Sequence, residues 1–466
     1  MDATLYSWGA AGEVTGSKHF LELGTKTLMV DCGAFQGRRA ESDRKNRAWP
    51  FEADGVDGVI LTHAHFDHCG LLPLLPRKGF SGNIHTTPAS RDLASLVMMD
   101  SAHIQARDME FLAKRAKRKG EHFAGTPLYD ERDVVRVLDY FVTVSYQRPF
   151  RPLDGVQATF FDAGHILGSA MAFVEADGLS IGFSGDLGRP GLPILRDPAQ
   201  LPAVDYLVLE STYGDRLHDP IAKAKDQLEK VVQRTIKRGG KIIIPAFAVE
   251  RTQELIYFLH ELRREERIPE IPIFVDSPMA TNATSIFRVH QECYDATARE
   301  EFLANHENPF GFNDLHYVSS VSESKKLNDL REPAILIASS GMCEAGRILH
   351  HLKNNAPDRK NTILIVGFMA NHTLGRRILE RQAKIKVFGD MYELNAEVVA
   401  LNTFSGHADY EDLMGFVSGQ DPARLKEIFL VHGEPDAQAN LKRLLEEQGF
   451  RATIVAYEER YTLRGR

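Results

Sequence analysis

The chain has 466 residues, of which 43% are hydrophobic and 26% charged, and its formal net charge is −8. This length fits two ordinary domains, because single cores stop growing near ~250 to 300 residues. The longest apolar runs, such as residues 242–249, are too short to cross a membrane, and the start MDATLYSWGA lacks a secretory signal, so we expect a cytoplasmic protein. The four cysteines are far apart and lack CxxC spacing, which argues against a disulfide framework and a thiolate zinc site.

The N-terminal part predicts a β-sheet followed by a helical region and more strands. HFLEL and TLMVDCG flank a Gly24-Thr25 turn, which is a hairpin signal. GVDGVILTHAH predicts a buried strand that runs into a histidine cluster, and the following LLPLL predicts the start of a helix. After a helical region near 91–140, strands recur at VQATFFDAGH, SAMAFVEA, LSIGFSGDLG and DYLVLESTYG. Each of these strands ends in polar residues.

From about residue 221 the pattern changes. Long helical segments alternate with continuous apolar strands, KIIIPAF, IPIFVDS, AILIASS and NTILIVGF, which predicts a parallel sheet covered by helices. Past about 388 the chain returns to short strands with polar ends. We therefore predict an α/β fold in which a domain at 209–387 is inserted between two parts of a first domain, 1–208 and 388–466.

The segment HAHFDH carries the strongest chemical signal. Side chains two residues apart in an extended segment project the same way, so His63 and His65 can converge on one cation. Asp67 and His68 lie past the bend and can reach a second ion. Imidazole and carboxylate are ordinary zinc ligands, whereas calcium requires an all-oxygen cage. Zinc is therefore the leading prediction.

Two further residues extend this set. His165 in FFDAGHILGS and Asp186 in GFSGDLGR each follow a predicted strand beside glycine, although either could also be a turn residue. Their order after Asp31 in VDCG and after HAHFDH resembles the metal-binding motifs of the metallo-β-lactamase superfamily. That resemblance implies an αββα sandwich with two metal ions at one edge. His63, His65 and His165 would hold the first ion, Asp67 and His68 the second, and Asp186 would bridge them. Asp31 would orient the ligands from a second shell.

Three later motifs resemble those of the β-CASP nucleases in this superfamily. They place Glu210 in LVLESTYG, His407 in FSGHAD and His432 in LVHGE, around the predicted insert. The resemblance implies an inserted β-CASP domain of mostly parallel sheet. It also implies that Glu210 positions His407 and that His432 completes the second metal site. Asp67, Glu210 and His407 are the candidate catalytic residues.

Histidine at position 432 indicates the RNA-processing branch, because the DNA-repair branch typically has valine there. The resemblance is to compact bacterial ribonucleases, and it implies hydrolysis of single-stranded RNA by two zinc ions, with manganese as an alternative. His407 would donate the proton to the leaving oxygen. An inactive RNA-binding subunit and a DNA-directed nuclease are the alternatives. Endonuclease or exonuclease action and a homodimer are left open.

The insert also offers candidate phosphate contacts. AILIASSGMCEAGRILHHL reads as strand, turn and helix, so Ser339, Ser340 and the amide of Gly341 could bind a phosphate at a helix N-terminus. GFMANHTLGRRI offers a similar turn beside Arg376 and Arg377. Serine-glycine turns are also common connectors without ligands. The basic run KRAKRKG at 114–120 could contact RNA, but the dipole of a solvated helix end also favours such residues.

Overall fold

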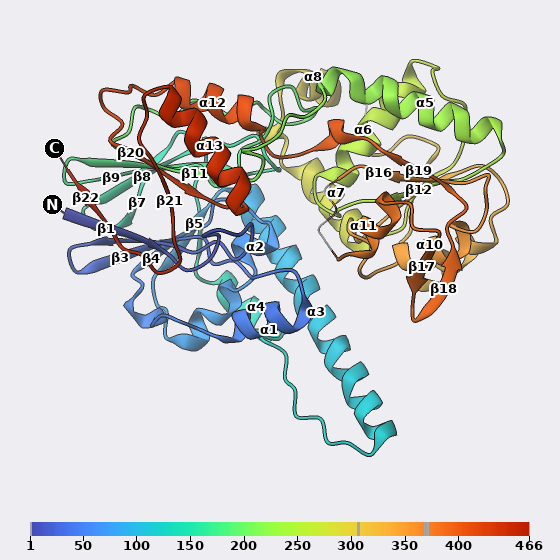
Figure 1. Cartoon of the computed structure of the whole chain (residues 1–466), viewed down its shortest axis with the longest axis horizontal. Helices are drawn as coiled ribbons and strands as arrows, with labels where there is room; N and C mark the ends of the chain where they lie inside the picture. Colours follow the sequence, from blue (N-terminus) through green and yellow to red (C-terminus); the bar gives the residue numbers. More distant parts are fainter. Residues whose placement is uncertain (1, 305–307, 368, 370–371, 466) are drawn as a thin grey trace. The chain divides into compact units, whose positions relative to one another are not determined.

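The computed structural model describes residues 2–304, 308–367, 369 and 372–465. The chain forms two compact units (Figure 1). The first unit comprises Met1–Pro190, Asp197–Leu217 and His407–Arg466, and the second comprises Gly191–Arg196 and His218–Gly406. Among the described residues, no helix combines the length and the apolar character needed to cross a membrane.

The first unit contains two seven-stranded sheets. The first sheet has the order β22 (Tyr461–Arg464), β1 (Asp2–Ser7), β2 (His19–Leu23), β3 (Lys26–Val30), β4 (Gly58–Ile60), β5 (Asn83–Thr86) and β6 (Phe141–Thr143). The second has the order β21 (Ala452–Ile454), β20 (Glu427–Val431), β11 (Tyr206–Glu210), β10 (Leu179–Phe183), β9 (Ala170–Ala176), β8 (Val156–Asp162) and β7 (Pro149–Leu153).

The strand directions bring several strand ends together. In the first sheet, β3 and β4 are parallel. In the second, β8 and β10 both run antiparallel to β9, and β10, β11 and β20 run parallel to one another. The carboxyl ends of β8, β10, β11 and β20 therefore lie at the same edge of that sheet. The polar residues that follow these strands are concentrated there.

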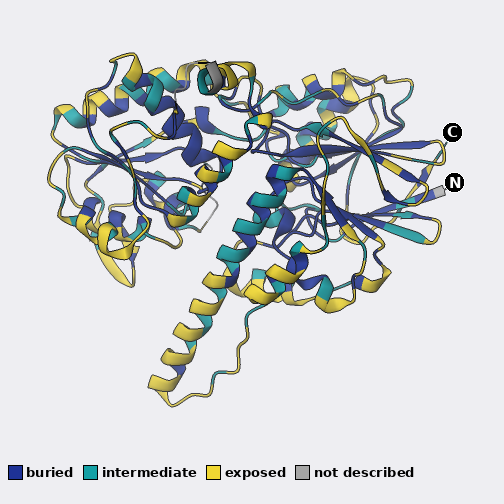
Figure 2. Cartoon of the chain, turned by 180° about the vertical axis from the view of Figure 1, so that it is seen from behind, coloured by how far each residue is buried: buried dark blue, intermediate teal, exposed yellow. Residues whose placement is uncertain are grey.

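The two sheets pack face to face through their apolar sides. Leu21 and Val30 from the first sheet belong to one buried cluster with Phe160 and Ile181 from the second. Alternate side chains of a strand point to opposite faces, so each strand supplies every second residue to this core. A second cluster joins the outer face of the second sheet to α12 (Tyr410–Ser418) and α13 (Pro435–Glu447). Figure 2 shows the buried interior between exposed helices.

The other helices of this unit are α1 (Arg39–Arg47), α2 (Phe66–Cys69), α3 (Pro88–Lys119) and α4 (Glu131–Leu138), with short 3-10 turns η1 (Ala53–Gly55), η2 (Leu72–Leu74) and η3 (Pro76–Lys78). The predicted helix at LLPLL is wrong. The helix α2 ends at Cys69, before this segment. Within LLPLL, Leu72–Leu74 form the 3-10 turn η2, whose second residue is proline. The predicted helical region at 91–140 is two helices separated by residues 120–130.

The second unit is built on one six-stranded sheet in which every pairing is parallel. Its order is β14 (Leu315–Tyr317), β13 (Ile273–Val275), β15 (Ile335–Ala338), β12 (Ile242–Pro245), β16 (Thr362–Ile365) and β19 (Glu397–Ala400). Fully buried strands such as β12, β15 and β16 account for the continuous apolar runs in the sequence.

Helices and short elements complete the second unit. They are η4 (Ile221–Lys223), α5 (Ala224–Lys237), α6 (Arg251–Arg264), α7 (Pro278–Val289), η5 (Gln291–Cys293), α8 (Ala296–Ala304), α9 (Val321–Lys326), η6 (Leu327–Asp329), α10 (Ile348–Asn355), α11 (Leu374–Leu379), the hairpin β17 (Lys384–Val387) and β18 (Asp390–Glu393), and η7 (Asn402–Phe404). The predicted architecture, a two-sheet α/β sandwich with an inserted and mostly parallel α/β domain, is confirmed.

The limits of the insert differ from those drawn at 209–387. Residues 209–217 belong to the first unit, and residues 388–406 belong to the second. The physical reason is strand pairing: β19 lies beside β16 in parallel register, from Thr362 opposite Glu397 to Ile365 opposite Ala400. A short strand with polar ends does not reveal which sheet it will join. The first domain therefore resumes at His407.

The core between the two sheets predicts a clear stability effect. Phe160 is fully buried in it, so Phe160→Ala should lower the free energy of unfolding by about 3 to 5 kcal/mol through lost burial and a cavity. Chemical denaturation measures this loss. Val135→Ala is the control, since Val135 is 57% exposed and should change stability by less than about 0.5 kcal/mol. Equal effects of the two substitutions would contradict this core assignment.

Candidate metal centre

The predicted metal ligands, together with Asp31 and Glu210, lie at or after the ends of strands of the first unit. Asp31 follows β3, and the histidine segment 63–68 follows β4. In the second sheet the corresponding residues are His165 after β8, Asp186 after β10, Glu210 at the end of β11 and His432 after β20. Strand direction, rather than proximity in sequence, therefore brings them to one place.

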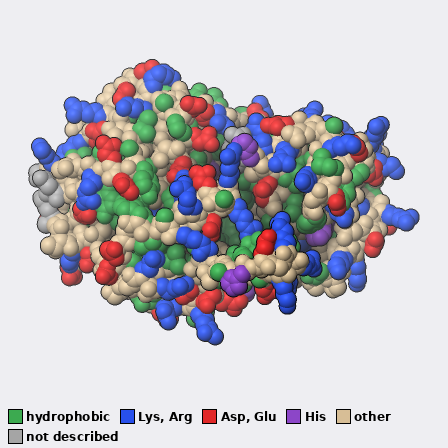
Figure 3. Space-filling view, turned by 60° about the horizontal axis from the view of Figure 1, so that its bottom comes forward, with side chains coloured by type: hydrophobic (Ala, Val, Ile, Leu, Met, Phe, Trp, Pro, Cys, Tyr) green, Lys and Arg blue, Asp and Glu red, His purple; other side chains and the backbone are tan. Residues whose placement is uncertain are grey.

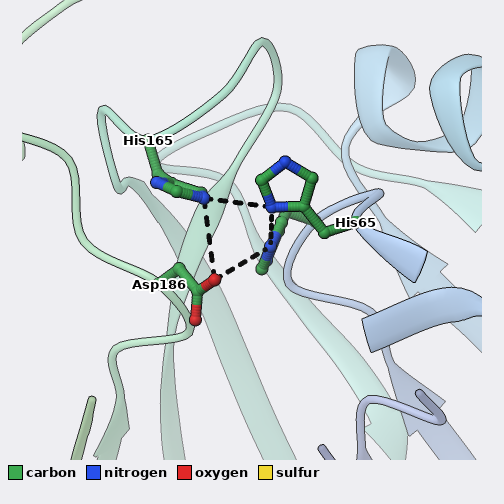
Figure 4. A group of neighbouring side chains, drawn as sticks. His65, His165 and Asp186 are labelled. Atoms are coloured by element: carbon green, nitrogen blue, oxygen red, sulfur yellow. Dashed lines mark hydrogen bonds and ion pairs between the residues drawn. The ribbon is translucent and has the colours of Figure 1, made fainter. Parts of the chain in front are cut away.

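The first group of ligands is His63, His65, His165 and Asp186, whose donor atoms lie within 4.8 Å of one another. The Nδ1 of His65 is 3.1 Å from the Nε2 of His63 and 3.1 Å from the Nε2 of His165. Asp186 Oδ2 lies 3.4 Å from His63 Nε2 and 3.6 Å from His165 Nε2. Figure 4 shows the ring nitrogens and the carboxylate turned toward a common point.

The second group is Asp67, His68 and His432, again with donor atoms within 4.8 Å of one another. His68 Nε2 is 3.3 Å from His432 Nε2, which is 3.5 Å from Asp67 Oδ2. The other oxygen of Asp186, Oδ1, lies 3.3 Å from His68 Nε2. One oxygen of Asp186 thus faces each group.

The donor set fits divalent metal ions. Asp186 Oδ1 is buried without a hydrogen-bond donor in the described part of the chain, which is costly unless a cation is bound beside it. Burial lowers the pKa of His63 and of His65 to about 4 and the pKa of His165 well below its usual value. These imidazoles are therefore neutral at pH 7 and offer lone pairs, as a metal ligand must.

The carboxylates remain ionised in this buried place. Burial by itself would raise the pKa of Asp186 and of Asp67, but the surrounding histidines outweigh burial and lower both values below their usual range. Burial similarly opposes the charged form of His68, yet Asp186 and Asp31 raise its pKa well above its ordinary value. Apart from His68, the centre is a set of carboxylates and neutral imidazoles, and a metal ion that binds to His68 would displace the proton on its Nε2.

Asp31 holds the centre from outside. Its carboxylate accepts hydrogen bonds from the Thr62 amide and hydroxyl, each at 2.8 Å, and lies 2.7 Å from His68 Nδ1. The bond to Nδ1 leaves the Nε2 of His68 directed at the centre. Thr62, which also lies 3.1 Å from His63 Nδ1, was missed by sequence reasoning, although it directly precedes the histidine segment.

Two hydroxyls touch the second group and were also missed. Thr212 Oγ1 lies 3.0 Å from His432 Nδ1 and donates to the His432 carbonyl at 3.1 Å. Ser17 Oγ lies 3.4 Å from His68 Nε2. In the sequence, Thr212 and Ser17 could have been suspected from their positions inside the motifs LESTYG and GEVTGS. Serine and threonine are too common in turns for that position to be decisive.

A third cluster joins Asp186, Glu210 and His407, with donor atoms within 4.8 Å of one another. Glu210 is fully buried, and its Oε1 lies 3.2 Å from His407 Nδ1 and accepts the Leu187 amide at 2.6 Å. Burial would lower the pKa of His407, but the Glu210 carboxylate outweighs it and raises that pKa to about 9. The side chain of His407 is 21% exposed, so it is a charged donor with access to solvent at neutral pH.

The candidate phosphate contacts lie in the second unit, and their predicted setting is wrong. Ser339, Ser340 and Gly341 follow β15, but α10 begins only at Ile348, so they form a loop and not a helix N-terminus. Ser340 Oγ accepts the loop's own Glu344 amide, and Ser339 Oγ donates to Ser277. These hydroxyls are used locally because the loop has to satisfy its own backbone.

The second candidate turn lies partly outside the described residues, at 368, 370 and 371. Beside it, Arg376 is bound to Glu380 at 2.7 Å, and Arg377 Nη2 donates to the His372 carbonyl at 3.4 Å. The basic run at 114–119 ends α3, as its helical pattern predicted.

Close backbone packing holds the histidine segment in place. The Cys32 amide donates to the His68 carbonyl at 2.8 Å, and a Cβ atom added to Gly33 would lie 1.5 Å from the Asp67 carbonyl oxygen. Gly33→Ala should therefore displace residues 67 and 68, reduce the metal bound per chain and cost about 1 to 3 kcal/mol of stability.

Metal analysis after dialysis, with thermal unfolding of the same samples, measures both effects. Gly55→Ala is the control, since nothing lies within 4 Å of a Cβ atom there. Full metal content in Gly33→Ala would show that this contact does not support the centre.

Comparison with known protein families gives three matches along the chain. Residues 12–246 match the metallo-beta-lactamase superfamily, residues 252–378 the Beta-Casp domain, and residues 391–455 the Zn-dependent metallo-hydrolase RNA specificity domain. The first match covers the histidine segment, His165, Asp186 and Glu210, and the third covers His407 and His432.

Individual relatives match almost the whole chain. Ribonuclease TTHA0252 of Thermus thermophilus is 34% identical over 452 residues, which cover 97% of this chain and 98% of that protein. Transcription termination factor FttA of Pyrococcus horikoshii is 37% identical over 449 residues, which cover 91% of this chain and 66% of that protein. A crystal structure of a protein of unknown function from Enterococcus faecalis covers 99% of this chain with a TM-score of 0.56 and 11% identity, which shows a shared fold.

Proposed function

This chain belongs to the metallo-β-lactamase superfamily, in its β-CASP branch, and we propose that it is a ribonuclease that hydrolyses single-stranded RNA with two zinc ions. As a member of this family it is a metal-dependent hydrolase. The resemblance of its motifs to that family is thereby confirmed. We propose, in addition, which bond is cleaved, how many metal ions are bound and what each residue does.

One observation carries the proposal: two groups of ligands share Asp186, and the His407–Glu210 pair stands beside them. His63, His65 and His165 would hold the first ion, and Asp67, His68 and His432 the second. Asp31 would orient His68. A protein that only binds RNA has no physical need for a buried carboxylate that faces two sets of neutral or paired imidazoles.

RNA is favoured over DNA and over small esters by the C-terminal part of the chain. The match to an RNA specificity domain at 391–455 includes His407 and His432, and the relatives with similar sequences include a ribonuclease. Small-ester hydrolases of the superfamily would not need the inserted second unit. The presence of histidine at 432 also agrees with the RNA-processing branch.

When bound, the two ions would supply an activated water and neutralise the phosphate charge. The residues of the chain perform the remaining steps. Asp186 keeps the two groups of ligands together, and Asp31 and Thr212 fix the rings of His68 and His432. Glu210 holds His407 in its charged form, and the exposed edge of His407 gives a proton to the leaving oxygen of the cleaved bond. The cleaved RNA would carry 5′-phosphate and 3′-hydroxyl ends.

The direct test incubates the zinc-loaded protein with end-labelled RNA and with DNA of matching sequence. We expect cleavage of RNA that a chelator abolishes and added zinc restores. His432→Ala should lose zinc and activity together, because it removes a ligand of the second group. His316→Ala is the matched control, since that histidine is exposed on β14 and belongs to none of the ligand groups. Cleavage of DNA alone, or RNA binding without any cleavage, would reject the proposal.

The role of His407 predicts a specific pH dependence. Its pKa of about 9 is above the ordinary value of 6.5, so it carries its proton below pH 9 and loses it as the pH rises through that value. The kcat/KM for RNA should therefore fall above about pH 9. Glu210→Gln removes the stabilising carboxylate, so the fall should begin at lower pH. His407→Ala should keep its zinc and lose ~10² to 10⁴ in rate.

Rates measured across this pH range, with zinc content determined for each variant, check these expectations. His316→Ala should retain the wild-type profile. If kcat/KM falls at the same alkaline pH in Glu210→Gln as in the wild type, His407 is not the group that titrates.

A further inference from the structure

Helix α3 continues far beyond the body of the first unit. Its first half is packed, but after Ala102 only Ala116 is buried (Figures 1 and 2). The residues from 103 to 119 span roughly 25 Å at the helical rise. This solvated half, which we name the arm, buries little apolar surface. Packing of the fold therefore does not account for it.

The tip of the arm is strongly basic. Five of the six residues in KRAKRK at 114–119 are Lys or Arg, and Lys114 alone has an acidic partner, Glu110 at 3.6 Å. Arg115, Lys117, Arg118 and Lys119 form no ion pair within the part of the chain that the structure describes. The helix dipole favours a basic residue in the last turn, but it does not account for a solvated helix of this length. Figure 3 brings the face around the arm forward and shows numerous Lys and Arg side chains on it.

A cavity of about 360 Å³ lies beside the base of the arm, in the same unit. Its lining includes three cations and no acidic residue. Arg47 and Arg77 are paired with Asp43 at 2.9 Å and Asp133 at 3.0 Å, which lie outside the lining, and Lys78 is the third cation. One wall is Thr126–Leu128, which lies on the segment that returns from the tip of the arm. Arg47 donates to the Thr126 carbonyl at 2.7 Å and Arg77 to the Leu128 carbonyl at 3.1 Å, so this wall is held to the body of the unit.

Trp49 gives this cavity an aromatic surface. The Nζ of Lys78 lies 5.0 Å from the centre of the indole, and the ring of Phe51 lies 4.6 Å away on centroids. The indole Nε1 is buried and has no hydrogen-bond acceptor among the described residues. Because that nitrogen is buried, the partly exposed ring and the nearby Lys78 are the features that a nucleobase and its phosphate could contact.

We propose that the arm and this cavity form one RNA-binding surface, distinct from the metal centre, that holds single-stranded RNA beyond the cleaved bond. The proposal rests on the ribonuclease function proposed above. The basic tip would contact backbone phosphates, and Trp49 would stack on a base. Charge favours RNA because it carries a negative charge at every phosphate, whereas a second copy of this chain spreads a net charge of −8 over 466 residues. Sites that bind single-stranded nucleic acids typically combine basic residues along the backbone with aromatic side chains that stack on bases.

The first test reverses the charge of the arm with Arg115→Glu, Lys117→Glu and Arg118→Glu. The matched control reverses three exposed basic residues elsewhere in the unit, Arg148→Glu, Arg151→Glu and Arg451→Glu, which make no ion pair in the described chain. Both are made in zinc-loaded His407→Ala protein, so that binding of a long RNA is measured by anisotropy without cleavage. We expect the arm variant to bind on the order of tenfold more weakly and its salt dependence to fall by about 2 in slope.

The control should bind within about twofold of the parent, because it changes net charge without touching the surface. Equal weakening in both triple variants would overturn the proposal, since it would show an effect of net charge alone. A change of sedimentation mass in the arm variant with unchanged RNA affinity would also overturn it and assign the arm to contact between copies of the chain.

The second test uses Trp49 as its own reporter. The chain has two tryptophans, so Trp8→Phe leaves Trp49 as the sole source of indole fluorescence. Long RNA should quench this fluorescence, and the arm substitutions should reduce the quenching at a given RNA concentration. A trinucleotide, which is shorter than the arm of roughly 25 Å and cannot contact both Trp49 and the basic tip, should quench weakly. No quenching by long RNA at saturation would reject the role of Trp49.

Activity separates this proposal from the function on which it rests. If the arm variant cleaves a trinucleotide as well as the parent does but loses efficiency on long RNA, both proposals hold. If long RNA quenches Trp49 and binds the arm but is never cleaved by wild-type protein, the ribonuclease proposal fails and the binding surface stands. If RNA is cleaved and the arm variant equals the control in every measurement, the binding surface is rejected alone.

Discussion

The centre of this protein depends on one buried carboxylate. Asp186 presents Oδ2 to His63 and His165 and Oδ1 to His68, so a single side chain joins two groups of ligands. A charge in so buried a place is costly unless cations or donors surround it. The surrounding histidines lower the pKa of Asp186, and Oδ1 makes no hydrogen bond among the described residues, as expected of an oxygen that binds a metal ion. The surrounding residues therefore stabilise the buried charge of Asp186 while each of its oxygens stays directed at one group of ligands.

In the two-sheet sandwich, the direction of the strands brings the two groups of ligands together around Asp186. β8, β10, β11 and β20 end at one edge of the second sheet. In the first sheet, β4 leads into the histidine segment, and its parallel neighbour β3 ends before Asp31, which binds His68. Backbone contacts then hold the loops, as where Gly33 approaches the Asp67 carbonyl too closely for any side chain. Outside the ligands, Asp31 and Thr212 bind the remaining nitrogens of His68 and His432. Rigid strands and short side chains thus hold the ligand atoms in fixed positions, as a metal site requires.

The motifs were recognisable in sequence because each combines unusual residue types in a short space. HAHFDH cannot easily be an ordinary turn, and the ordered positions of His165, Asp186 and His432 follow strands that the apolar pattern predicted. The supporting hydroxyls Thr62, Thr212 and Ser17 could not be separated from common turn residues. The setting of Ser339 and Ser340 was misread, because a strand followed by Ser-Ser-Gly does not show how many loop residues precede the next helix.

The amino-acid sequence alone was enough to predict the α/β class, the inserted parallel sheet and the candidate metal-binding side chains. These are local properties, because hydrophobic period and ligand chemistry are carried by neighbouring residues. The tertiary structure alone decided that β19 joins the inserted sheet and that the first domain resumes at His407. It also decided that Asp186 faces both groups and that Glu210 raises the pKa of His407. Such facts depend on pairing and burial between residues hundreds of positions apart, and no local pattern encodes them.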